Sequence, residues 1–109
     1  MKKRVIITTS FPAIHYWEQC PIESVGFLRN PHRHVFHVTV KIPVNHDDRD
    51  IEFIDFKNKL EKYIQEVFYN KNIGQTSCEM ICKEIMLHFP LITYIKIMED
   101  NENGAEFEF

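Results

Sequence analysis

The chain has little glycine, proline and cysteine, with three, five and three residues among its 109. So little glycine and proline, beside 44% apolar residues, excludes collagen-like and low-complexity chains and is typical of a globular domain. No apolar run approaches the roughly 18 residues that a membrane-spanning helix requires, so we expect no membrane association. The odd number of cysteines, without a C-x-x-C pair, favours reduced thiols in a cytoplasmic protein over a disulfide framework.

An excess of positive charge is also missing. The formal net charge is −3, with 13 basic against 16 acidic residues, so we expect no nucleic-acid partner. The length suffices for one small domain, to which we assign residues 1–109. A domain of this size buries only about two-thirds of its unfolded surface, so we expect a modest core.

Alternating apolar positions predict strands at residues 4–14, 32–44, 91–98 and 105–109, with a short additional strand at 51–54. Helical spacing predicts one helix that follows Asp55 as its N-cap, and a second that follows a capping box at residues 76–79 and ends at Pro90. Cys78 and Cys82 lie on the apolar stripe of the second helix, and we interpret them as core thiols. The order ββααββ predicts an α+β fold, in which two helices cover one face of an antiparallel four-stranded sheet.

His32 and His34 are separated by one residue at the start of a predicted strand, which puts both imidazoles on one face. Upstream, His15 ends a run in which Phe11, Ala13 and His15 alternate with other residues. If the two strands are neighbours, three imidazoles converge on one ion. Imidazole nitrogen is a favoured ligand of zinc and suits other divalent metals, and three protein ligands leave a position open for reaction or binding. The alternative is that these histidines are unrelated polar residues in a domain without metal.

Glu99 follows Ile95 and Ile97 on the same face of the third long strand. A carboxylate buried there without a partner is costly. Its two oxygens match two parallel hydrogen bonds from an amino-pyrimidinone edge, as they match a guanidinium. The alternative is a solvent-exposed side chain at the end of a strand.

Five short motifs resemble, in order, those of the tunnelling-fold family that includes 6-pyruvoyl tetrahydropterin synthase and 6-carboxy-tetrahydropterin synthase. The family patterns are F-x-A-x-H, H-G-H, V-D-F, T-S-E and E-T. Their counterparts here are Phe11-x-Ala13-x-His15, His32-Arg33-His34, Ile54-Asp55-Phe56, Ser77-Cys78-Glu79 and Met98-Glu99. Together the motifs span nearly the whole chain and match the predicted ββααββ order.

The resemblance implies that His15, His32 and His34 bind Zn²⁺, and that Glu99 and Ser77 contact a pterin-like ligand. It implies the activity of a pterin synthase on a substrate such as dihydroneopterin triphosphate, in queuosine-precursor or reduced-pterin metabolism. It also implies that subunits join their sheets into a barrel. We therefore expect a homo-oligomer, a trimer or hexamer, with sites at the subunit interfaces.

The chain departs from the family pattern at the catalytic residues. The family's catalytic cysteine lies four residues before the H-x-H pair, where this chain has Leu28, and the family's Asp-His segment between the helices is missing. General acid–base groups contribute about 10²–10⁴-fold to rates, so their function would fall to Cys20 or Glu23 in the loop at residues 16–31. The alternative is a catalytically inactive protein that binds metal and a pterin or purine on the same scaffold.

Overall fold

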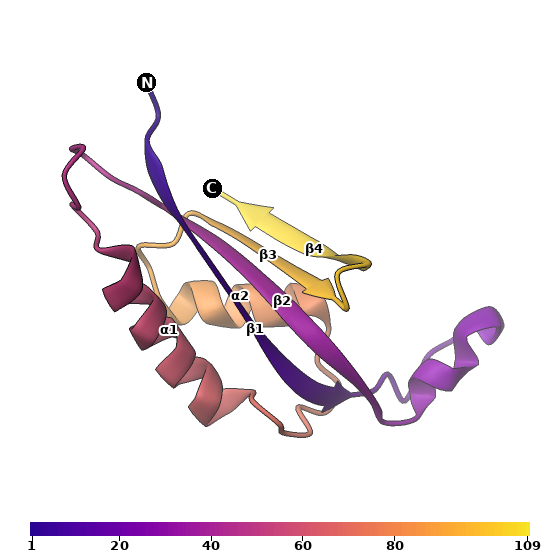
Figure 1. Cartoon of the computed structure of the whole chain (residues 1–109). Helices are drawn as coiled ribbons and strands as arrows, with labels where there is room; N and C mark the ends of the chain where they lie inside the picture. Colours follow the sequence, from indigo (N-terminus) through magenta and orange to yellow (C-terminus); the bar gives the residue numbers. More distant parts are fainter.

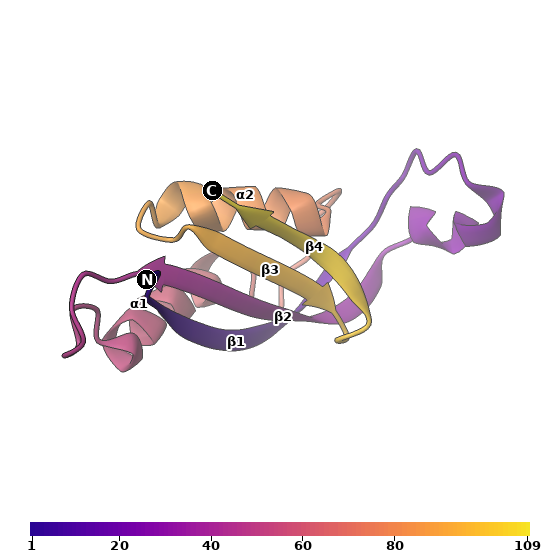
Figure 2. The same cartoon turned by 90° about the horizontal axis from the view of Figure 1, so that it is seen from above.

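Four strands form one antiparallel sheet, whose spatial order β1-β2-β3-β4 is also their order along the chain (Figure 1). The computed structural model describes all residues, 1–109. Its elements are β1 (Arg4–His15), the 3₁₀ helix η1 (Glu23–Arg29), β2 (His32–Pro43), α1 (Phe53–Val67), α2 (Cys78–His88), β3 (Tyr94–Glu99) and β4 (Asn103–Glu108). Both α-helices cover the same face of the sheet (Figure 2). This arrangement confirms the predicted α+β fold with its ββααββ order.

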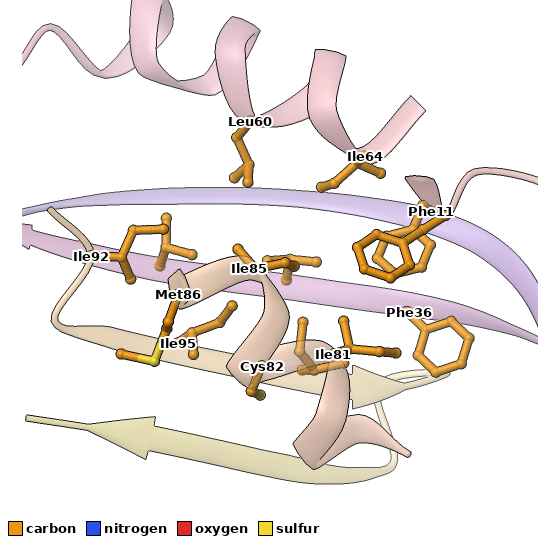
Figure 3. Packing of buried hydrophobic residues seen from close by; sticks show 14 of the residues in the cluster. Phe11, Phe36, Leu60, Ile64, Ile81, Cys82, Ile85, Met86, Ile92 and Ile95 are labelled. Atoms are coloured by element: carbon orange, nitrogen blue, oxygen red, sulfur yellow. The ribbon is translucent and has the colours of Figure 1, made fainter. Parts of the chain in front are cut away.

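The hydrophobic core fills the space between that face and the helices (Figure 3). Successive side chains of a strand point to opposite faces, so alternate strand residues enter the core. These inward residues include Ile7, Phe11, Phe36, Val38, Val40, Ile95 and Ile97. On the helix side, buried residues four apart on each helix pack onto the sheet, namely Leu60 and Ile64 of α1 and Ile81 and Ile85 of α2.

Helix α1 begins earlier than the sequence suggested. Its N-cap is Glu52, not Asp55, because the Glu52 carboxylate accepts the backbone N–H groups of Ile54 at 2.7 Å and Asp55 at 3.4 Å. The predicted short strand at residues 51–54 is therefore wrong. Phe53 and Ile54 are 52% and 62% exposed, so the apolar residues of this segment do not form a buried strand face.

Helix α2 is capped by Ser77 rather than by Thr76, the first residue of the predicted capping box. The Ser77 hydroxyl accepts the backbone N–H of Met80 at 3.2 Å. The helix ends at His88, two residues before Pro90, which the sequence predicted to stop it. Neither α-helix has the length and apolar character that crossing a bilayer would require.

The last two strands begin at different residues from those predicted. Strand β3 starts at Tyr94 instead of residue 91, and β4 starts at Asn103 instead of residue 105. Glycine is required at position 104, because a Cβ there would lie 1.8 Å from the carbonyl oxygen of Ile97. This close approach lets β4 pair with β3 from its first residues.

Residues 16–31, which we call the arm, project beyond the end of the sheet in both views (Figures 1 and 2). We predicted a long loop here, and the structure adds η1 within it. The base of the arm is closed by the Trp17 N–H, which donates to the Leu28 carbonyl at 2.7 Å. The arm stretches the molecule to 51 Å, and the radius of gyration is 15.2 Å. A compact domain of this length has a radius of gyration of about 13 Å.

Phe11 stacks between Phe36 and Phe68, with ring centroids 5.3 Å from each. We expect Phe11→Ala to lower the free energy of unfolding by about 3–5 kcal/mol, because it removes this contact and leaves a cavity. Urea denaturation measures the loss. The control is Ile6→Ala on the opposite face of β1, where the side chain is 58% exposed and the expected change is within about 0.5 kcal/mol. Equal losses in the two variants would contradict this account of the core.

Candidate metal centre and adjoining cavity

Two strand ends bring three imidazoles together. In the β1–β2 register His15 lies directly opposite His32, and Ala13 lies opposite His34. His34 shares a face with His32, because the two are separated by one residue. One ring nitrogen of each histidine lies within 4.8 Å of the other two. The structure thus brings together the three histidines that the sequence singled out.

Each of these histidines is oriented by a hydrogen bond at Nδ1. The acceptors are oxygens: the Thr76 carbonyl for His15 at 2.7 Å, the Asn30 carbonyl for His32 at 2.8 Å, and the Asp100 carboxylate for His34 at 2.6 Å. A carbonyl or carboxylate oxygen only accepts, so each Nδ1 carries the hydrogen. In the neutral ring Nε2 then presents a lone pair.

The three Nε2 atoms are buried and have no hydrogen-bond partner. An unpaired buried acceptor is costly, and a cluster of three needs an explanation. Three imidazoles whose ligand nitrogens lie within 4.8 Å of one another match the donor set of a catalytic zinc site, which leaves one coordination position open. The residues therefore fit a divalent metal, and imidazole alone does not select zinc over similar ions.

His15 is the most buried of the three ligand candidates, at 8% exposure. Its ring lies edge-on to Phe36, with centroids 5.3 Å apart, at the end of the aromatic stack in the core. Burial lowers the pKa of His15 from its ordinary value, against the opposing effects of Thr76 and Glu99. The neutral imidazole that results is the form that binds metal.

Glu99 ends β3 beside the imidazoles. Its Oε1 lies 3.4 Å from Nε2 of His15, and its Oε2 lies 3.3 Å from Nε2 of His34. The Cys78 thiol donates a hydrogen bond to Oε1 over 3.6 Å. Burial, followed by the Glu99 carboxylate, raises the pKa of Cys78 to about 12, so this thiol stays protonated and acts as a donor. Cys78 is buried, as predicted for a core thiol, and also contacts the site.

Asp100 is a site residue that the sequence analysis did not assign. Its carboxylate accepts the Nδ1–H of His34 and the backbone N–H of Val35, the latter at 2.9 Å. These two hydrogen bonds, with Val35 the stronger influence, hold the pKa of Asp100 below its usual range. A carboxylate behind a ligating imidazole fixes its tautomer and raises its basicity. Asp100 therefore favours metal binding by His34.

A cavity of about 560 Å³ opens beside the histidines, two of which, His15 and His32, form part of its wall. Aromatic and apolar side chains form another part, from Tyr16, Trp17, Leu28 and Met80. Polar side chains complete it, from Gln75, Ser77 and Glu99 among others. This size and mixture are typical of a small-molecule site, and both predicted ligand contacts, Glu99 and Ser77, line it.

The two residues considered for proton transfer, Cys20 and Glu23, lie in the arm and do not line the cavity. The Cys20 thiol is buried within the arm, 3.7 Å from the Ile22 carbonyl oxygen and 3.9 Å from that of Val25. The Glu23 side chain is 88% exposed and pairs with Arg29 at 3.0 Å. A catalytic role for Cys20 or Glu23 stays a prediction.

The site and the fold define a class of protein: a small α+β tunnelling fold with three histidines at adjoining strand ends. Among solved structures, the chain is similar to the Caenorhabditis elegans 6-pyruvoyl tetrahydropterin synthase, with a TM-score of 0.76 and 13% sequence identity. The match covers 100% of this chain and 96% of that one. No protein-family model and no curated protein sequence matches the chain. The likeness establishes the fold, and a fold by itself does not carry residue roles.

We expect Asp100→Asn to weaken metal binding about 10–100-fold, because the neutral amide no longer raises the basicity of His34. Asparagine tolerates the left-handed backbone at this position, where φ is 53°, so the change isolates the charge. Competition with a metal chelator measures the affinity. The control is Asp48→Asn, whose side chain is 83% exposed and bonds only its neighbour Arg49. An unchanged affinity in Asp100→Asn would show that the Asp100–His34 hydrogen bond does not support a metal ligand.

Proposed function

We propose that residues 1–109 form a single-domain, zinc-dependent protein of the 6-pyruvoyl or 6-carboxy-tetrahydropterin synthase type, which acts on a pterin such as dihydroneopterin triphosphate. The observation that carries this proposal is the convergence of three buried, unpartnered Nε2 atoms at a cavity of about 560 Å³. The fold that the chain shares with a 6-pyruvoyl tetrahydropterin synthase supports it.

The cavity offers groups for both parts of such a substrate. The Glu99 carboxylate can accept two hydrogen bonds from the amino-pyrimidinone edge of a pterin ring. The Ser77 hydroxyl accepts the Met80 N–H, so its own hydrogen remains free to donate into the cavity. Tyr16 and Trp17 supply aromatic surface for the ring. When bound by the three histidines, the metal supplies Lewis-acid polarisation of a substrate oxygen.

A second function, binding of metal and a pterin or purine without turnover, is favoured by what lines the cavity. Leu28, at the position of the family's catalytic cysteine, is an apolar part of the wall. The segment between α1 and α2 contains neither Asp nor His, and it is fixed against β1. Asn70 donates to the Pro12 carbonyl at 2.7 Å, and Ile14 donates to the Lys71 carbonyl at 2.9 Å. Neither Leu28 nor the segment between α1 and α2 therefore offers a substitute for the catalytic cysteine and the Asp-His pair of the family.

We also propose a cytoplasmic homo-oligomer, a trimer or hexamer, with the cavity at the subunit interface. The exposed apolar residues of the arm support this assembly: Trp17, Ile22 and Phe27 are 43%, 49% and 67% exposed. Trp17 and Leu28 belong to both the arm and the cavity wall, so a copy that covered the arm would also border the cavity. Strand β4 leaves its outer side unpaired, and β1 does so outside residues 12–14, which bond residues 70–73; joining sheets would satisfy these free groups.

We expect the protein, purified without a histidine tag, to hold about one zinc per chain and to lose it in His32→Ala. At a free metal concentration about 100-fold above the Kd, zinc should stabilise the fold by about 2.7 kcal/mol, seen as a rise in Tm. The matched control is His46→Ala, in an exposed turn, which should retain both the zinc and the rise in Tm. No metal in the wild-type protein would overturn the proposed function.

Incubation of the zinc-loaded protein with dihydroneopterin triphosphate separates the two functions. A synthase releases a 6-pyruvoyl or 6-carboxy-tetrahydropterin and loses this activity in His32→Ala. A binding protein retains the compound, measured by calorimetry or equilibrium dialysis, and forms no product. A wild-type protein with zinc that neither binds nor converts this pterin would contradict the first function, and one that binds neither a pterin nor a purine would contradict the second.

We expect Phe27→Asp to shift the protein from oligomer to monomer, because it places a charge on the exposed apolar arm. Light scattering after size-exclusion chromatography measures the mass. The control is Leu87→Asp on α2, which changes an equally apolar residue that is 75% exposed and lies outside the arm. A Phe27→Asp protein with the wild-type oligomeric mass would show that the arm does not hold the assembly together.

A further inference from the structure

We propose that Glu99 is a fourth, displaceable ligand of the metal centre in the ligand-free protein, and that the Cys78 thiol positions its carboxylate there. This role rests on the metal site proposed above and adds to the contact of Glu99 with a pterin. With Glu99 bound, the metal would have four protein ligands and no open coordination position. A bound small molecule that displaces Glu99 would open the fourth position.

The first argument is the meeting of four acceptor atoms. Oε1 and Oε2 of Glu99 face Nε2 of His15 and of His34, at 3.4 Å and 3.3 Å. Each of these imidazoles donates its Nδ1 hydrogen elsewhere, to Thr76 or Asp100. A carboxylate and two imidazole lone pairs repel one another at such distances unless positive charge lies between them.

The second argument is the length of these separations. A hydrogen bond between a protonated imidazole and a carboxylate spans about 2.7–2.9 Å, which is shorter than both. Ligand atoms bonded to one tetrahedral zinc at about 2.0–2.1 Å lie about 3.3–3.4 Å from one another. Each observed separation, 3.4 Å from Oε1 to His15 and 3.3 Å from Oε2 to His34, is close to that spacing and too long for a direct charge-assisted hydrogen bond.

The third argument is that the Cys78 thiol and the β3 backbone hold the Glu99 carboxylate in place. Cys78 is the first residue of α2, and its thiol donates to Oε1 of Glu99 over 3.6 Å. The backbone of Glu99 is fixed by its place in β3, opposite Phe36 of β2 and Asn103 of β4. Both side chains line the cavity, so an entering ligand that offers two N–H groups would compete with the metal for the same oxygens.

The affinity for metal alone is the first test, measured by chelator competition. We expect Glu99→Gln to weaken Zn²⁺ binding about tenfold or more, because an amide oxygen is a poorer ligand than a carboxylate. The matched control is Glu102→Gln in the exposed β3–β4 turn, which should bind as the wild type does. Cys78→Ala should lose roughly two- to fivefold, and Cys78→Ser, which retains a donor, should lose less.

The spectrum of the Co²⁺-loaded protein is the second test, because its d–d bands report coordination number and geometry. We expect Glu99→Gln to change these bands and Glu102→Gln to leave them unchanged. Saturation of the wild-type protein with neopterin, which carries the amino-pyrimidinone edge, should change the bands as well. Unchanged bands at saturating neopterin would show that Glu99 is not displaced.

One combination of results would overturn the role of Glu99 as a metal ligand and still support the three-histidine site. In that combination Glu99→Gln binds metal with wild-type affinity and d–d bands, whereas His32→Ala abolishes metal binding. Loss of affinity in Glu99→Gln but not in Cys78→Ala would remove the positioning role of Cys78 alone. A wild-type protein that binds neither Zn²⁺ nor Co²⁺ would refute the proposed function together with this inference.

Discussion

The site depends on the register between β1 and β2. Twelve residue pairs join these strands, and the last pair sets His15 opposite His32. A slip by one residue would turn every side chain of one strand to the other face, and it would separate the imidazoles at the same time. The burial of Phe11 opposite Phe36 fixes the register, because a slip would also expose those rings to water. The same hydrophobic pairing therefore stabilises the fold and aligns the candidate ligands.

The ends of β1 and β2 place polar groups without hydrogen-bond partners beside the hydrophobic core, which lowers the stability of the fold. Three unpaired nitrogens and a carboxylate adjoin an aromatic stack, where an unsatisfied polar group costs about 1–3 kcal/mol. Bound cation and ligand would offset this cost, which is the usual reason why such clusters occur at functional sites. The cavity combines this charge-binding end with aromatic walls and with the apolar side chain of Leu28.

Much of the fold could be predicted from the sequence, because strand periodicity and helical spacing are local properties. Apolar alternation located all four strands of the sheet, and Pro90 marked the end of α2. The start of α1 was missed because Glu52, a less common N-cap than Asp55, accepts the first N–H groups. The direction of the arm was also beyond prediction, since no periodic pattern fixes a segment that leaves the sheet.

The sequence by itself singled out the side chains of the candidate metal centre. A period of two places His15 on one strand face with Phe11 and Ala13, and it places His32 and His34 together on one face of the next strand. Only the tertiary structure decided what surrounds them. The hydrogen bond of Asp100 to His34 joins residues 66 apart, and that of Cys78 to Glu99 joins residues 21 apart. Such contacts depend on the β2–β3 register and on where α2 crosses the sheet, and both are set by packing over the whole core.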